Sequence, residues 1–311
     1  MKNKIKVLLC LCFAFAVTVF AANSKEFKIS YVNSALNLPN MIEKDQKLFE
    51  KEFKKDGYSF QFPHYFSAPD QAKALISGDL DAANAVGAIA VIAALSNGAD
   101  IKVISMYSRS PKAFFIMTKD PSITNIKSLK GKKIAGPQGT VLHEMLGAAL
   151  TKNGMSLKDV QHLPMGIDLA FTAMESKTVD AVLLTGAAAQ KAKASGARII
   201  ADGEGLIGGE LVIAVSGKLY RDNPDFAKRL IKVHRQSLEY LKANPEKVYK
   251  LASKESGIPE NAVKEMASYQ DYDPQFSPVD IKNLKSTVKF LLDNKMIKKG
   301  IDVDLYFQNI D

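Results

Sequence analysis

The sequence predicts an α/β protein of two lobes, each a mainly parallel sheet flanked by helices, with two strands that cross between the lobes. Segments that alternate apolar and polar residues, as strands do, recur between segments of helical periodicity. This order of strand and helix is typical of parallel sheets covered by helices on both faces. The same order begins again after Pro121, which indicates a second lobe.

The first half of the chain alternates between strand and helix. Alternation predicts strands at 27–31 and 58–62, and short apolar runs predict strands at 80–83 and 101–105. Pro39 opens a helix that Gly57 ends. Further helices are expected at 69–76 and 87–96.

The second half follows the same rule and then becomes helical. Strands are expected at 133–135, near His162, and at 179–183, 198–200 and 211–215, and helices at 140–152, 167–175 and up to Ser195. The last helices are predicted at 224–243, 245–253, 259–269 and 278–294. Each of these begins at or beside a proline, whose missing N–H is no loss in the first turn.

A repeated segment supports the two lobes. Residues 77–87 match residues 176–186 in spacing, with Asp81 opposite Asp180 and Gly87 opposite Gly186. Chance similarity between segments rich in Ala and Gly is the alternative. We interpret 114–118 and 210–215 as the crossing strands. Lobe one is then 23–117 plus 211–311, and lobe two is 118–210.

The N-terminal segment predicts export. Lys2, Lys4 and Lys6 precede an apolar run at 7–20 and small residues near Ala21, the order of a secretory signal peptide. We expect residues 1–21 to be cleaved near Ala21 and the mature protein to be periplasmic. A retained membrane anchor is the alternative.

Cysteine content and charge exclude several classes of function. Cys10 and Cys12 both lie in the expected signal peptide, so the mature chain would have no disulfide, thiolate metal site or cysteine nucleophile. Cleavage removes three lysines and no acids, which lowers the net charge from +9 to +6. The lysines are scattered, which argues against nucleic-acid binding. The histidines show no metal-ligand spacing, and we expect no metal or cofactor.

Several motifs resemble one known family. Residues 128–135 (SLKGKKIA), 139–143 (GTVLH), 148–150, 77–82 and 196–203 are similar to the nitrate, taurine and alkanesulfonate group of periplasmic binding proteins. That group includes binders of thiamine-pyrimidine precursors. The resemblance implies a type II periplasmic-binding fold, a ligand in the cleft between lobes, and delivery to the permease of an ABC importer.

Candidate binding residues of lobe two lie at the starts of helices. Gly139, Thr140 and Val141 separate a strand from a helix, where free backbone N–H groups and the helix dipole suit an anion. Thr140 as a simple N-cap is the alternative. Thr185 and Gly186 occupy the matching loop. Family members often have serine and asparagine at 140 and 141 and an acid in the second loop, so this chain argues against a strongly polar ligand and against taurine.

Candidate residues of lobe one follow its strands. Asn33, Ser34 and Leu36 follow the first strand, Ser67 follows the second, and Asn84, Ala85 and Val86 form an expected loop after the third. Turn capping is the alternative for the small polar residues.

Other polar side chains could also take part. Arg109 and Glu210 lie near the crossings, where Arg109 could clamp an anion, pair with Glu210 or, as we favour, remain a solvated surface arginine. His143 is expected to pack in a helix rather than touch a ligand.

These residues predict a monomeric binding protein for a small, partly apolar molecule with one anionic or hydrogen-bonding end. Hinge motion would close the cleft on the ligand. An enzyme is the first alternative, because some menaquinone-pathway enzymes that act on chorismate-derived acids have a similar fold. The signal peptide and the lack of an evident catalytic set argue against it. A sensory binding protein is the second alternative.

Overall fold

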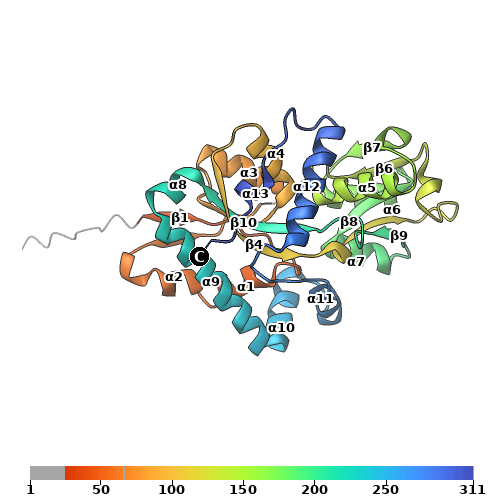
Figure 1. Ribbon diagram of the computed structural model, residues 1–311. Helices are drawn as coiled ribbons and strands as arrows, with labels where there is room; N and C mark the ends of the chain where they lie inside the picture. The colour runs from red at the N-terminus through yellow and green to blue at the C-terminus, as the bar shows by residue number, and fades with distance from the viewer. Residues whose placement is uncertain (1–24, 66, 311) are drawn as a thin grey trace, which may run out of the picture.

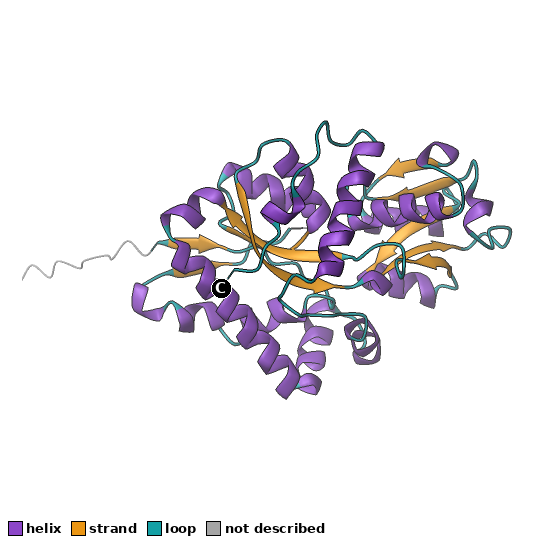
Figure 2. Ribbon diagram, viewed as in Figure 1, coloured by secondary structure: helices purple, strands orange, loops and turns teal. Residues whose placement is uncertain are grey.

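The computed structural model describes residues 25–65 and 67–310 and confirms a two-lobed α/β architecture (Figure 1). The predicted signal peptide at 1–21 and both cysteines lie outside the described residues. We term the part built on strands β1–β4 and β10 lobe one, and the part built on β5–β9 lobe two. Helices flank the sheets of both lobes (Figure 2).

Lobe one contains a parallel pair, β1–β2, and a three-stranded sheet in the order β3-β10-β4. A parallel bridge from Ile29 to Ala82 joins the pair to the sheet. Stacking of Phe27 on Phe226, with ring centroids 4.1 Å apart, holds helix α9 against β1. The strands are β1 (Glu26–Lys28), β2 (Ser59–Gln61), β3 (Ala82–Gly87), β4 (Ile101–Arg109) and β10 (Glu210–Ser216). The helices before the crossing are α1 (Leu38–Asp45), α2 (Leu48–Glu52), η1 (Lys54–Asp56), α3 (Ala68–Ser77), α4 (Ala88–Ser96) and η2 (Pro111–Ala113).

Lobe two contains a five-stranded sheet in the order β7-β6-β8-β5-β9. Buried aliphatic residues of β6 and β8 fill its core, because parallel strands covered on both faces are apolar throughout. The strands are β5 (Phe114–Thr118), β6 (Lys133–Gly136), β7 (Gln161–Pro164), β8 (Ala181–Thr185) and β9 (Arg198–Asp202). The helices are η3 (Ile126–Leu129), α5 (Val141–Lys152), η4 (Leu157–Asp159), α6 (Ile167–Glu175) and α7 (Gly186–Ala194).

The C-terminal part is helical, and the four helices predicted there begin at or beside a proline. Its elements are α8 (Gly217–Asp222), α9 (Pro224–Ala243), α10 (Pro245–Ser256), α11 (Glu260–Ala267), α12 (Pro278–Asp293) and α13 (Val303–Tyr306). Helices α8 and α13 were not predicted. Within residues 25–65 and 67–310, no helix is both long and apolar enough to span a membrane.

The structure differs from the sequence predictions in three places. The sheets are mixed, because β10 pairs antiparallel with β3 and β4, and β5 pairs antiparallel with β8 and β9. The helix expected from Pro39 onward is broken at Lys47, which has a left-handed φ of 51°. The loop expected at 84–86 is wrong: β3 continues to Gly87, and the chain makes a bulge there with Ala85 at a φ of 65°.

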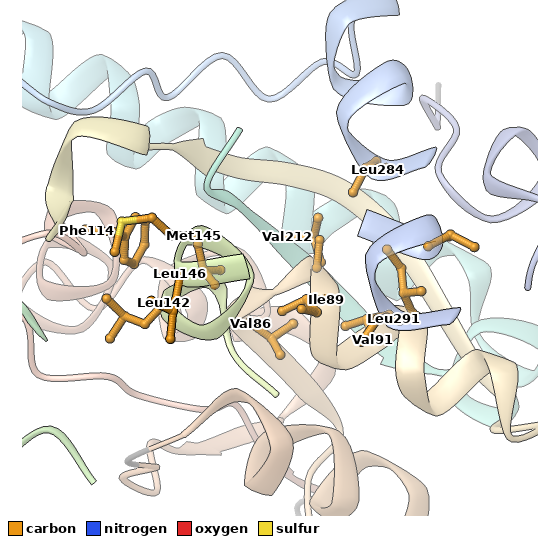
Figure 3. Packing of buried hydrophobic residues seen from close by; sticks show 14 of the residues in the cluster. Val86, Ile89, Val91, Phe114, Leu142, Met145, Leu146, Val212, Leu284 and Leu291 are labelled. Atoms are coloured by element: carbon orange, nitrogen blue, oxygen red, sulfur yellow. The ribbon is translucent and has the colours of Figure 1, made fainter. Parts of the chain in front are cut away.

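One apolar core extends across both lobes. Figure 3 shows Leu142 and Met145 of α5 in the same cluster as Val86 of β3 and Leu291 of α12. Helix α12 packs on α4 of lobe one and on α5 of lobe two. Helix α12 therefore packs on both lobes, although the sequence prediction places it in lobe one.

An ion pair fixes the start of α12 to the end of β4. At the end of β4, Arg109 Nε and Nη2 each lie 2.6 Å from an oxygen of Asp280, in a bidentate arrangement. Arg109 also donates to the carbonyl oxygens of Asp273 and Gln275. The Asp280 side chain is 2 % exposed, and burial alone would raise its pKa, but the bonds from Arg109 and Ser277 hold the pKa below its usual range. The expectation of a solvated Arg109 is therefore wrong.

We predict that Arg109→Met destabilises the protein by about 3–5 kcal/mol, because it leaves the carboxylate of Asp280 buried without its cation. Urea unfolding followed by circular dichroism measures this loss. The double variant Arg109→Met/Asp280→Asn should lose less than the single variant. A loss below about 1 kcal/mol for Arg109→Met would show that the pair is no more than a surface salt bridge.

Candidate ligand-binding site

Two segments of lobe one lie at the carboxyl ends of neighbouring strands. Ser30 N donates to Ala82 O at 2.9 Å and Asn84 N donates to Ser30 Oγ at 2.8 Å, so the chain after β1 runs beside β3. Residues 32–37 follow β1, and Gly87 ends β3. Open α/β sheets bind ligands at this edge.

Lobe two presents the equivalent edge. Strands β6 and β8 are parallel neighbours, with Ala135 opposite Val182. The residues at the start of α5, 139–141, and those at the start of α7, Thr185 and Gly186, therefore leave the same edge of the sheet.

The two edges face each other at short range. A Cβ added to Gly87 would lie 3.4 Å from Ala68 Cβ and 3.7 Å from Val141 Cγ2. A Cβ added to Gly186 would lie 3.7 Å from Ser34 Oγ. The structure thus brings together expected site residues from both lobes. Gly87 was not among the predicted site residues, although its match with Gly186 in the repeat was the available signal.

Three helices, α4, α5 and α7, begin at these edges. Within the described chain, no side chain caps α4, α5 or α7. Thr140 occupies the N-cap of α5, but its hydroxyl donates to Pro137 O at 3.1 Å. Thr185 occupies the N-cap of α7, and its hydroxyl donates to Ala113 O at 2.7 Å. Because first-turn N–H groups have no acceptor inside the helix, these ends suit an anion.

The candidate serines of lobe one form hydrogen bonds within their own turns. Ser67 caps α3: its Oγ accepts from Asp70 N at 3.3 Å and donates to Asp70 Oδ2 at 2.5 Å. Ser34 Oγ accepts from Leu36 N at 3.3 Å, and the Leu36 carbonyl accepts from the Tyr272 hydroxyl at 2.9 Å. The capping alternative therefore holds for Ser67.

The side-chain amides of two candidate binding residues, Asn84 and Asn33, donate to other groups of the protein. Asn84 is 4 % exposed, and its Nδ2 donates to Glu43 Oε2 at 2.6 Å in the interior of lobe one. Asn33 Nδ2 donates to Glu255 O at 3.1 Å, which ties the loop to α10. The strand therefore turns the Asn84 side chain towards the interior of lobe one.

The apolar residues at the base of the lobe-one edge are buried, as expected: Leu36, Ala85 and Val86.

Glu210 and Arg109 lie opposite each other in the β10–β4 ladder, yet Arg109 bonds Asp280 rather than Glu210. Glu210 is 4 % exposed, and burial raises its pKa above the usual range. The facing edges are therefore rich in backbone N–H, hydroxyl and apolar groups. Across residues 25–65 and 67–310, no cluster of three His, Cys, Asp or Glu residues could hold a metal.

A family model described as NMT1/THI5 like matches residues 53–248. The chain belongs to this family. It is 25 % identical to a protein of Escherichia coli named as aliphatic sulfonates-binding, over 97 % of this chain and 95 % of the relative. It is 28 % identical to a Bacillus subtilis protein of the same name, over 90 % of this chain and 84 % of the relative.

A solved structure confirms the fold. The alkanesulfonate-binding protein of Xanthomonas axonopodis pv. citri, bound to MOPS, superposes with a TM-score of 0.83 at 23 % identity. The match covers 93 % of this chain and all of that chain. The type II periplasmic-binding fold implied by the sequence motifs agrees with this similarity, and the expectation of a binding protein rather than an enzyme agrees with the relatives' names.

We predict that Gly186→Ala destabilises the protein by about 1 kcal/mol, because Gly186 has a left-handed φ of 58° that a Cβ disfavours. Gly87→Ala is the matched control, since Gly87 has a φ of −61° and its added Cβ makes ordinary contacts. Thermal unfolding of the two variants measures the difference. Equal midpoints would contradict the backbone argument.

Proposed function

We propose that this protein is a periplasmic solute-binding protein that holds an aliphatic sulfonate between its lobes and delivers it to an ABC importer. The observation that carries the proposal is the meeting of the first turns of α4, α5 and α7, none of them capped by a side chain in the described chain. The names of the curated relatives support the choice of ligand.

The chemistry of the edges suits a sulfonate with an apolar tail. Its three oxygens accept from several backbone N–H groups at once, and the positive ends of helix dipoles stabilise its charge without a lysine or arginine. Val141 and Leu36 are buried apolar residues beside these ends. The loop 184–186 has no acid to pair with an ammonium group, which disfavours taurine.

The proposed site combines residues of both lobes. We assign ligand contact to the groups at the facing edges: Ser34, Leu36, Val86, Gly87, Gly139, Thr140, Val141, Thr185 and Gly186. The proposed lobes are 23–117 plus 211–311 and 118–210, with β5 at the boundary, where it pairs into the sheet of lobe two.

The proposed hinge is formed by the two connections between the lobes, residues 110–113 and 203–209, which touch each other. A Cβ added to Gly209 would lie 3.0 Å from Pro111 N, and Gly209 has a φ of 67°. Rotation at these segments would open the facing edges and admit the ligand.

Export and partner follow from the same proposal. Residues 1–21 would be the signal peptide, cleaved near Ala21, and the mature protein would act as a monomer that docks on the permease. Relatives that bind sulfonates in the periplasm support this location.

We predict that 1-pentanesulfonate raises the thermal midpoint of the protein, while pentanoate has a smaller effect and pentylammonium has none. A ligand at a hundred times its Kd stabilises the native state by about 2.7 kcal/mol. The proposal fails if pentylammonium stabilises the protein and pentanesulfonate does not.

We further predict opposite effects of Thr140→Asp on stability and on binding. An aspartate at the N-cap accepts from the first-turn N–H groups of α5 and so stabilises the helix by about 0.5–1 kcal/mol. The same carboxylate occupies the proposed anion position, so the Kd for pentanesulfonate should rise at least about a hundredfold, measured by calorimetry.

Thr140→Ser is the matched control for this variant and should keep both the stability and the affinity of the parent. Unchanged affinity of Thr140→Asp would place the anion somewhere other than the first turn of α5.

A further inference from the structure

Two histidine rings lie against the turn that precedes α5. His143 is in the first turn of α5 and His162 is in β7. Their ring centroids are 4.5 Å apart and the planes are 14° from parallel, so the rings are stacked. His143 is 3 % exposed.

Each ring makes one hydrogen bond to the turn at 136–140. Gly139 N donates to His143 Nδ1 at 3.3 Å, so Nδ1 must carry no proton. His162 Nε2 lies 3.2 Å from Gly136 O, and because a carbonyl oxygen only accepts, Nε2 must carry the proton. One ring accepts and the other donates, and together they hold both ends of the turn.

The surroundings of the pair keep both rings neutral. Burial and the neighbouring His162 lower the pKa of His143 to about 4, and burial lowers the pKa of His162. Phe290 of α12 meets His143 edge-on at 5.7 Å, and it fits there because residue 147 is glycine.

Charged side chains of α5 and α12 near the pair bond to residues other than the two histidines. Glu144, the next residue of α5, bonds Thr287 of α12. On α12, Lys285 pairs with Asp304 and Lys289 pairs with Asp293. Among the described residues, the charge that acts on the pKa of His143 is that of His162.

We propose that His143 and His162 are positioning residues that hold the 136–140 turn in the shape that presents the first-turn N–H groups of α5 to the ligand. This inference rests on the proposed function, since it assigns the anion to the same helix end. The bond to His143 takes the N–H of Gly139, so Gly139 lines the proposed site only through its Cα, and the N–H groups of Val141 and Leu142 are left for the ligand.

Protonation would undo this arrangement. A protonated His143 cannot accept from Gly139, and a second proton on His162 would stack two cations. Ligand affinity should therefore fall as the pH is lowered from 7 towards 4. A sulfonate remains anionic throughout this range, so its own charge does not contribute to the change.

The first test compares paired variants by calorimetry with 1-pentanesulfonate at pH 7.5. His143→Asn keeps an acceptor for Gly139 and His162→Gln keeps a donor for Gly136, whereas His143→Leu and His162→Leu keep neither. We expect the leucine variants to bind about tenfold more weakly, as the loss of one hydrogen bond implies, and the amide variants to bind within about threefold of the parent. Equal affinity of all four variants would overturn the proposal.

The second test is the pH profile of affinity between pH 7.5 and pH 4, over which circular dichroism confirms that the protein stays folded. Because the pKa of His143 is about 4, about half of the molecules carry its proton at pH 4, so the parent should lose about twofold in affinity there and little above pH 5. The double variant His143→Asn/His162→Gln should show a flat profile. An equally steep profile in the double variant would assign the effect to other groups and refute the role of the pair.

A third test needs no ligand. Amide hydrogen exchange, measured by NMR on the free protein, should show Gly139 protected in the parent and in His143→Asn but not in His143→Leu. If pentanesulfonate does not bind the parent, the proposed function fails, and the exchange at Gly139 still decides whether the pair holds the turn. Equal exchange in all three proteins overturns the inference even if the ligand binds.

Discussion

The backbone N–H groups in the first turn of a helix cannot find acceptors within the helix, and the rest of this structure is arranged around that constraint. At α5 and α7 the chain supplies threonines at the N-cap, but both hydroxyls donate to nearby carbonyl oxygens. In α5 His143 N donates to Thr140 O at 3.0 Å, so an acceptor outside the helix would meet the earlier amides, those of Val141 and Leu142. Because one edge belongs to each lobe, a single anion between them would couple the two lobes.

The scaffold keeps these helix ends opposite each other. Parallel pairing of β6 with β8 places the starts of α5 and α7 on one edge, and the link from Ile29 to Ala82 does the same in lobe one. Helix α12 packs on both lobes, and the buried pair of Arg109 and Asp280 fixes its start to the end of β4. With the proposed hinge at the two connections between the lobes, the shape of the site depends on lobe closure.

Local sequence patterns were enough to predict most of the strands and helices and the correspondence between the two lobes. Alternation and helical periodicity predicted the strands and helices of both lobes, and the repeat with Gly87 opposite Gly186 predicted where the lobes would correspond. Glycine at 139 and at 186 marked helix starts correctly, and both have left-handed φ values. These features depend on residues close together in the chain.

The failures depend on contacts between distant residues. Asn84 was expected in a loop, but the strand continues through a bulge and its amide meets Glu43 of α1. Arg109 was expected to be solvated, but its partner Asp280 lies on α12, far along the chain. The stacking of His143 on His162 likewise joins α5 to β7 and has no periodic signature.

The anion-holding role of the helix ends is the central claim, and NMR titration of the amide groups with 1-pentanesulfonate tests it most directly. The account predicts the largest shifts at 87–90, 140–143 and 186–189, in both lobes at the same ligand concentration. Shifts confined to one lobe, or centred on surface lysines, would contradict it.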